Sequence, residues 1–466
     1  MLVIVSDIHF TDDGFNKTIP AQALRIFRER LRDMAYDASW RAGGVYRPIE
    51  ELDLVLLGDI LDVIRSERWP NTEPGDADPV RPWSGADQPH LQEKVGEIID
   101  AILERNEPAM QVLRSFHDPG VMTLPPATAQ GKVARVSREP DSPQRVPVRV
   151  RIHYVAGNHD WFLHLPGPAF DQIRRRVVER MGLDQPADRP FPYQPEDCPR
   201  LATLCQQHRV YLRHGDYFDV FNFHGDRRTA SIGDAIVIDL LNRFCATVNA
   251  RLGPDLPAEC VAGLQQIDHL RPLLIAPLWV DSLLRRTCPD PKLAEEVKRI
   301  WDDVADRFLQ LDFVRQCAEH LPALTLDKLA IALKFSKGVS LSLLGQLFAW
   351  FSEKLPAANE RPSAEDALSE RAFKNRSART IVYGHTHQHE IVPLDVSPAQ
   401  GGWLQQIYAN TGTWRVINRR VLLRRQVPEF MSHWVMTYLA VYQGDERGGR
   451  PFEAWSGALA LPAEGY

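Results

Sequence analysis

The chain has 466 residues, of which 44% are hydrophobic, and its 55 Lys and Arg against 61 Asp and Glu give a formal net charge of −6. This length exceeds what one hydrophobic core usually serves, so a main domain with at least one added unit is expected. The acidic balance excludes a global attraction to nucleic acid or to an anionic membrane. The six cysteines form no Cys-x-x-Cys pair and are too few for a disulfide scaffold, which favours reduced thiols.

The first half of the chain alternates strand-like and helix-like segments. Between short β-rich runs, apolar residues recur at helical spacing, as Leu24, Phe27, Leu31 and Met34 do. This order of strand, helix and strand predicts a parallel sheet with right-handed crossovers. The predicted strands cover residues 2–5, 52–57, 148–156 and 210–212, and the predicted helices cover 20–38, 91–116 and 168–181.

Between residues 221 and 375 the pattern changes to helices without a comparable strand signal. We interpret residues 221–375 as a helical insertion, a lid or cap, within a domain formed by residues 1–220 and 376–466. Strand-like runs return after the insertion and are expected to complete a second sheet. The predicted helices cover 232–252, 273–286, 292–311 and 326–355, and the predicted strands cover 380–383, 406–410, 414–417, 421–423 and 433–442.

Five polar clusters each directly follow a predicted strand. In a mostly parallel sheet, ligands bind beyond the carboxyl ends of the strands, so these clusters can converge as the ligands of two metal ions. Asp7 and His9 lie two residues apart, and on an extended strand end such side chains point to the same side. The clusters are Asp7-Ile8-His9, Gly58-Asp59, Gly157-Asn158-His159-Asp160, His214-Gly215-Asp216 and Gly384-His385-Thr386-His387.

The order of these clusters resembles the signature of the calcineurin-like metallophosphoesterases, which runs DxH, GDxxD, GNH[DE], a lone His and GHxH. The second element is matched by Gly58-Asp59-Ile60-Leu61-Asp62. The resemblance covers the chain before about residue 219 and after residue 378. It implies an α/β fold of two packed mixed β-sheets flanked by helices, a four-layer sandwich, into which the large helical insertion is placed.

The resemblance also implies a role for each side chain. His159 is the catalytic group just outside the metals, and Asp62 holds its other ring nitrogen. Mixed nitrogen and oxygen ligands without thiolate favour Mn²⁺, Fe or Zn²⁺ over Ca²⁺ or Cu(I), and we take Mn²⁺ as the first choice. The metal ligands implied are Asp7, His9 and His387 for the first ion, Asn158, His214 and His385 for the second, and Asp59 as the bridge between them.

Two nearby residues, His224 and Asp160, are placed outside the expected ligand set. His224-Gly225-Asp226 repeats the lone-histidine tripeptide but follows no predicted strand, so we favour His214 as the ligand. Asp160 is interpreted as a cap or a hydrogen-bond acceptor behind the ligands.

The chemistry implied by the resemblance is hydrolysis of a phosphate ester or pyrophosphate bond by a metal-bridging hydroxide that attacks phosphorus in line. His214-Gly215-Asp216, the insertion and Asn410-Thr411-Gly412-Thr413-Trp414 look like the branch that includes UDP-2,3-diacylglucosamine pyrophosphatases. Those enzymes carry Arg where this chain has His159, and their insertion is shorter. The substrate therefore stays open between a phosphomonoester, a nucleotide or nucleoside-diphosphate compound and a phosphodiester.

Three alternatives remain beside this expectation. The first is a UDP-sugar-lipid or other lipid-linked pyrophosphate bound at the insertion. The second is a nuclease, which the acidic balance and the lack of an aromatic and basic patch disfavour. The third is a non-catalytic scaffold with the same fold, which the intact ligand set disfavours. The chain begins with a strand rather than a signal peptide and has no run of transmembrane length, so a cytoplasmic enzyme is expected.

Overall fold

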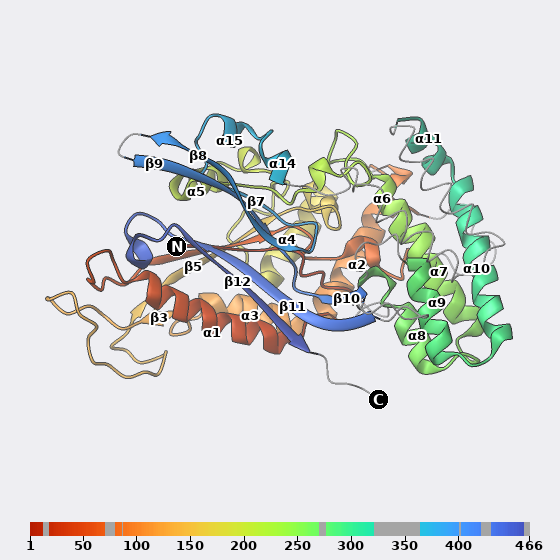
Figure 1. Ribbon diagram of the computed structural model, residues 1–466, viewed down its shortest axis with the longest axis horizontal. Helices are drawn as coiled ribbons and strands as arrows, with labels where there is room; N and C mark the ends of the chain where they lie inside the picture. Colours follow the sequence, from red (N-terminus) through yellow and green to blue (C-terminus); the bar gives the residue numbers. More distant parts are fainter. Residues whose placement is uncertain are drawn as a thin grey trace.

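The computed structural model describes residues 1–12, 18–69, 80–85, 87–269, 276–320, 364–399, 402–420 and 430–460. In these ranges the chain has an α/β fold with mixed sheets flanked by helices, as predicted. Figure 1 shows the helices of the predicted insertion, α6 to α11, gathered at one end of the molecule beside the strands. Among the described residues, no helix combines the length and apolar character needed to cross a bilayer.

The first sheet has six strands in the order β10-β11-β1-β2-β5, with β12 paired to β11. Three of the four strands predicted for the first half lie in this sheet, and β1 and β5 run parallel to β2 on either side of it. The antiparallel strand β11 covers the other side of β1, which would otherwise be an open edge. The strands are β1 (Leu2–Val5), β2 (Glu51–Leu57), β5 (Arg149–Val155), β10 (Val416–Arg420), β11 (Phe430–Val441) and β12 (Phe452–Ala460).

The second sheet has four strands in the order β6-β7-β9-β8. The prediction that all returning strands complete this sheet is wrong, because β10 and β11 pair with the first sheet. Of the returning runs in the described residues, those at 380–383 and 406–410 lie in the second sheet. The predicted strand at 421–423 lies outside the described residues. The strands are β6 (Val210–Leu212), β7 (Thr380–Tyr383), β8 (His389–Ala399) and β9 (Gly402–Thr411), and a separate two-stranded pair joins β3 (Thr123–Leu124) to β4 (Val146–Pro147).

The two large sheets share a hydrophobic core. Alternate residues of a strand point to opposite faces, so the first sheet has one face toward the second sheet and one toward the helices. In β1, Leu2 and Ile4 pack in a cluster with Leu212 and Val382 of the second sheet, whereas Val3 and Val5 face the helices. The helices on that outer face are α1 (Ala21–Ala38), α2 (Pro89–Arg105), α3 (Glu107–Arg114) and α4 (Pro168–Met181), while α5 (Pro199–His208) contributes to the core between the sheets.

One predicted helix is two helices in the structure. The segment at 91–116 breaks at Asn106, where α2 ends and α3 begins. Pro108 explains the break, since a proline inside a helix removes a backbone donor and clashes with the preceding turn. The Asn106 amide donates to the carbonyl oxygens of Ile102 and Thr11, which satisfies acceptors at the break.

The inserted helices enclose a core of their own. Phe244, Leu283, Ile300 and Phe308 are buried together in it. The predicted helix at 232–252 is found with the same ends and contains a π-helical stretch, and the one at 292–311 is found one residue earlier. The predicted helix at 273–286 is found over its described part, and the one at 326–355 lies outside the described residues. The elements are α6 (Ile232–Ala235), the π-helix Ile236–Asn242, α7 (Arg243–Leu252), α8 (Ala258–Leu264), α9 (Ala276–Thr287), α10 (Pro291–Gln310), α11 (Asp312–His320), and then α14 (Ala364–Ala367) and α15 (Arg371–Lys374) before β7.

A buried ion pair joins Asp239 of the π-helix to Arg81, which precedes α2 in the chain. Arg81 donates from Nε and Nη2 to the Asp239 carboxylate at 2.8 and 3.0 Å, and both residues are almost fully buried. Burial alone would raise the pKa of Asp239, but Arg81 and Arg243 outweigh it and lower the pKa. A carboxyl group with a lowered pKa in the folded state contributes stability above its unfolded pKa, and this contribution is lost as the pH falls through the folded value.

We expect Arg81→Met to lower the free energy of unfolding by about 3 kcal/mol, because it leaves Asp239 buried with a weaker set of partners. Urea denaturation followed by circular dichroism measures the loss, which should shrink in the acidic range where Asp239 becomes protonated. Arg47→Met is the control, since Arg47 is exposed and lies 3.4 Å from Asp445. Equal losses in the two variants would contradict a special role for the buried pair.

Candidate metal centre

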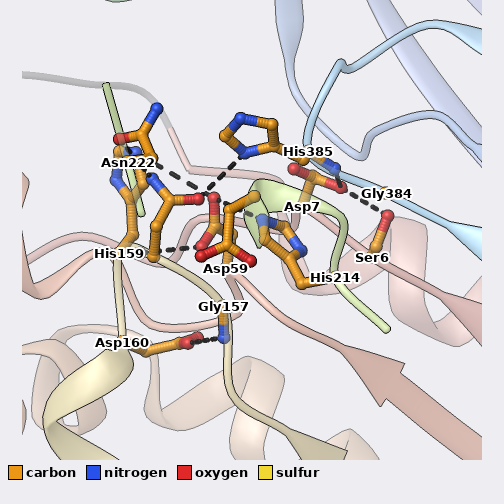
Figure 2. A network of polar contacts seen from close by, with 12 residues as sticks. Ser6, Asp7, Asp59, Gly157, His159, Asp160, His214, Asn222, Gly384 and His385 are labelled. Carbon is orange, nitrogen blue, oxygen red and sulfur yellow. Dashed lines mark hydrogen bonds and ion pairs between the residues drawn. The ribbon is translucent and has the colours of Figure 1, made fainter. Parts of the chain in front are cut away.

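The carboxyl ends of strands from both sheets meet at one place. The loops after β1 and β2 are joined there by a hydrogen bond from Asp7 N to Gly58 O (3.0 Å), and Gly384 N after β7 donates to His214 O after β6 (2.8 Å). Figure 2 shows Asp59 in the middle of this region, with Asp7, His214, His385 and His159 around it. The five polar clusters predicted to converge are therefore adjacent.

The backbone at the candidate ligands has an unusual conformation. Five of them have φ angles between 53° and 67°, in the left-handed region that residues with a Cβ rarely adopt. They are Asp7, His9, Asp59, His385 and His387. Such strain persists only where the surrounding structure over-determines it, and it concentrates at functional sites. The expectation that Asp7 and His9 share a side through an extended strand end is therefore wrong, because β1 ends at Val5 and both residues follow in left-handed turns.

Two glycines of the signature are needed for close approach. A Cβ at Gly157 would lie 2.4 Å from Asp59 Oδ1, and a Cβ at Gly384 would lie 2.6 Å from Asp7 Oδ2. Neither glycine has a positive φ angle, so a glycine is needed here because a side chain would collide with the carboxylate, and not because of the backbone conformation. The glycines let neighbouring loops approach the carboxylates.

A first group of ligand atoms comes from Asp7, His9, Asp59 and His387, and these atoms lie within 4.8 Å of one another. His387 Nε2 is 3.2 Å from Asp7 Oδ1 and 3.1 Å from His9 Nε2. His9 Nε2 is 3.7 Å from Asp59 Oδ2. This group contains the three residues expected at the first metal and the expected bridge.

A second group consists of Asp59, His214 and His385, with Asn158 beside it. His214 Nε2 is 3.1 Å from Asp59 Oδ2, and its Nδ1 is 2.9 Å from Leu57 O, which places the ring proton on Nδ1 and turns Nε2 toward the site. His385 Nδ1 is 2.9 Å from Asn158 Oδ1. The three residues expected at the second metal are thus together, and Asp59 belongs to both groups.

Asp62 joins a ligand histidine to the predicted catalytic histidine. Its two oxygens contact His9 Nδ1 at 2.8 Å and His159 Nδ1 at 2.5 Å. The His159 side chain is 12% exposed, and its Nε2 is 3.9 Å from Asp59 Oδ2. His159 is thus partly exposed, whereas Asp62 is fully buried.

The electrostatics of the cluster favour charged carboxylates. Burial would raise the pKa of Asp59, but His214 and His159 outweigh it and hold this pKa well below its usual range. Burial likewise opposes ionisation of Asp7, and His214 and His387 again reverse the effect, so its pKa is low. The reciprocal effect of Asp59 raises the pKa of His214 against the effect of burial. Positive charge is needed beside these carboxylates, and it comes from protonated histidine or from cations.

Asp160 lies behind the ligands, in the supporting role expected for it. Its carboxylate accepts hydrogen bonds from Ile60 N (2.8 Å), Gly157 N (2.6 Å) and the Tyr154 hydroxyl (2.6 Å). Burial and the negative charge of Asp59 raise its pKa to about 6. Asp160 therefore orders the loops that carry the ligands.

The donor set fits divalent cations. Asp7 Oδ1 and His214 Nε2 are buried and have no hydrogen-bond partner, although both point into the cluster. Burying a polar atom without a partner costs about 1–3 kcal/mol, and a cation would satisfy both atoms. Carboxylate, imidazole and amide ligands without thiolate suit Mn²⁺, Fe or Zn²⁺. The side chains therefore form two groups that could hold cations, and Asp59 belongs to both.

The nine predicted site residues all lie in this cluster, and His224 lies outside it, bonded through Nε2 to Val220 O on an exposed turn. Sequence reasoning missed Asp219 and Asn222, which contact His385 and Asn158. It also missed Ser6, whose hydroxyl donates to Asp7. Asp219 follows His214 by five residues, but a single Asp in a loop carries no distinctive signal in the sequence.

Searches with protein-family models and among curated proteins find no match for this chain. Its function is therefore argued from the geometry and chemistry of the cluster.

We expect Mn²⁺ at about 100 times its Kd to stabilise the protein by about 2.7 kcal/mol and to raise the midpoint of thermal unfolding. Asp59→Asn should abolish this shift, because the amide removes the charge and one of the oxygens common to both ligand groups. Differential scanning calorimetry with and without Mn²⁺, and with a chelator, measures the effect.

Asp53→Asn is the matched control for this experiment. Asp53 is also buried and contacts a histidine, His153 Nε2, at 2.7 Å, but it lies outside the ligand groups. The control should keep the Mn²⁺-dependent shift even if its stability falls. A full shift in Asp59→Asn would contradict the assignment of Asp59 as the common ligand.

Proposed function

We propose that this protein is a dinuclear metal-dependent phosphohydrolase of the calcineurin-like metallophosphoesterase type, acting on a phosphate ester or pyrophosphate bond. The observation that carries the proposal is the Asp59 carboxylate, which belongs to two ligand groups built from the strand ends of both sheets. When bound, two divalent cations supply Lewis acidity that polarises a phosphoryl group and lowers the pKa of water. Mn²⁺ is the first choice, with Fe or Zn²⁺ as alternatives.

The chain itself supplies the proton for the leaving group in this proposal. Asp62 accepts from His159 Nδ1, which leaves Nε2 as the atom that faces a bound substrate. Burial would raise the pKa of Asp62, but His159 and His9 outweigh it and keep this pKa low, so the carboxylate is charged. A charged Asp62 stabilises the protonated ring of His159, which then donates a proton from Nε2 to the departing oxygen.

The arrangement of layers supports the same family. Helices α1 to α4 cover one sheet, the two sheets share a core, and α14 and α15 pack with residues such as Tyr211 and Ile381 on the far side of the second sheet. This is consistent with the four-layer sandwich that the resemblance implies. It also supports the assignment of residues 1–220 and 376–466 to one catalytic domain.

The proposed substrate is a phosphorylated small molecule or a nucleotide-type compound. The described part of the insertion uses large apolar side chains such as Phe244, Leu283 and Phe308 for its own core, which disfavours these residues as a seat for an acyl chain. A lipid-linked pyrophosphate is therefore the weaker alternative. The complete ligand set argues against a non-catalytic scaffold, and the acidic balance argues against a nuclease.

We expect His159→Ala to reduce kcat by about 10²- to 10⁴-fold, as is usual when a general acid is removed, while both metals remain bound. The loss should be larger for phenyl phosphate than for p-nitrophenyl phosphate, because a poorer leaving group depends more on protonation. Steady-state hydrolysis of these esters and of bis-p-nitrophenyl phosphate with Mn²⁺, beside elemental analysis, measures both properties.

His153→Ala is the control, because it also removes a histidine that contacts an aspartate. His153 contacts Asp53, which lies outside the ligand groups. It should keep kcat close to that of the wild type. Loss of the metals in His159→Ala would contradict its catalytic role and make it a ligand. Metal binding without hydrolysis of any of these esters by the wild type would instead favour the scaffold.

A further inference from the structure

A closed ring of polar contacts surrounds the second ligand group. Asp219 Oδ2 lies 2.9 Å from His385 Nε2 and accepts a hydrogen bond from Asn222 Nδ2 at 2.7 Å. Asn222 Oδ1 in turn accepts from Asn158 Nδ2 at 3.2 Å, and Asn158 Oδ1 is 2.9 Å from His385 Nδ1. Asp219 and Asn222 therefore contact two of the three side chains expected at the second metal and lie outside the ligand set.

The ring fixes which atoms of the two ligands face the metal site. The Asp219 carboxylate holds the proton of His385 on Nε2, so the neutral imidazole has a lone pair on Nδ1. The Asn222 oxygen holds the amide group of Asn158, so the Asn158 oxygen points the other way. In this tautomer two electron-pair donors, His385 Nδ1 and Asn158 Oδ1, face each other at 2.9 Å. A cation resolves this contact, because it can accept both lone pairs.

The same ring touches the start of the helical insertion. Gly233 in α6 donates from its backbone N to Phe221 O at 2.7 Å. A Cβ at Gly233 would lie only 2.1 Å from Asn222 Oδ1. Because Gly233 does not have a positive φ angle, alanine suits its backbone, and the collision with Asn222 is the main consequence of this substitution. Asn222, which lies at the start of the insertion, is thus held in close contact with α6.

We infer that Asp219 and Asn222 are positioning residues that set the affinity of the second metal site separately from the first, and that α6 of the insertion controls Asn222. This inference rests on the proposed two-metal function. The hydrogen bonds by which Asp219 and Asn222 contact candidate ligands go to His385 and Asn158 of the second site. A carboxylate that orients a metal-binding histidine is typically worth about 10- to 100-fold in metal affinity.

The test is Mn²⁺ titration of the full chain by isothermal titration calorimetry, with electron paramagnetic resonance of the loaded protein. The wild type should bind two ions and give the signal of a coupled Mn²⁺ pair. Asp219→Ala and Asn222→Ala should weaken one binding step by about 10- to 100-fold, keep the other within about threefold, and give the six-line signal of an isolated ion. The Mn²⁺ affinity of Asp219→Asn at this step should lie between that of the two alanine variants and that of the wild type, since its amide oxygen still accepts from His385.

Gly233→Ala tests the link to the insertion without removing a polar group, and it should weaken the same binding step. Its control is Gly96→Ala, another helical glycine, where a Cβ would meet the end of Arg176 at 3.2 Å. Asp226→Ala is the control for Asp219→Ala, since Asp226 lies on the same segment and bonds to Arg228. Both controls should bind two ions as the wild type does.

The outcomes separate this inference from the proposed function. A wild type that binds no Mn²⁺ would overturn the proposed function itself. Two unchanged binding steps in Asp219→Ala and Asn222→Ala, or equal weakening of both steps in variants whose circular dichroism is native, would overturn the inference alone. If Asp219→Ala fails to fold, Asn222→Ala and Gly233→Ala decide the result by the same criterion.

Discussion

The Asp59 carboxylate is the point where the two sheets meet, and the site depends on its contacts. It follows β2 of the first sheet, and its Oδ2 lies 3.1 Å from His214 of the second sheet and 3.7 Å from His9. A buried carboxylate costs several kcal/mol unless positive charge compensates it, so the histidines must come from strands close enough to reach it. The packing of one sheet on the other, through Ile4 and Leu212 for example, provides that proximity.

The same constraint explains the strained backbone. Strands end before the cluster, and a continued extended chain would carry Asp7 or His387 past Asp59. A left-handed residue turns the chain sharply instead, at a cost of the order of 1–3 kcal/mol for each such position. The cost is offset by fixed contacts on both sides, such as Trp414 N to Asp7 O at 3.1 Å and His9 N to Asp59 O at 2.9 Å.

The strands and ligands that could be predicted from the sequence are those marked by neighbouring residues in the chain. The runs before Asp59 and His385 are short and apolar, and turn glycines follow them, so both the strand ends and the clusters could be predicted. The partner of β1 could not, because pairing with β11 joins residues more than 400 positions apart and no local pattern encodes it. The contacts of Asp219 and Asn222 were missed for the same reason, since they depend on loops brought together only by the complete fold.

The insertion is more than a unit placed on the surface of the two sheets. Asn242 of its π-helix bonds to Arg65, at the end of the short turn that begins after Asp62, while Gly233 of α6 packs on Asn222. The first contact holds the turn that follows Asp62, and the second lies at Asn222, which bonds to Asn158 of the second ligand group. A helical unit that only covered a substrate would need neither contact. The insertion therefore contacts two separate parts of the site, one through the π-helix and one through α6.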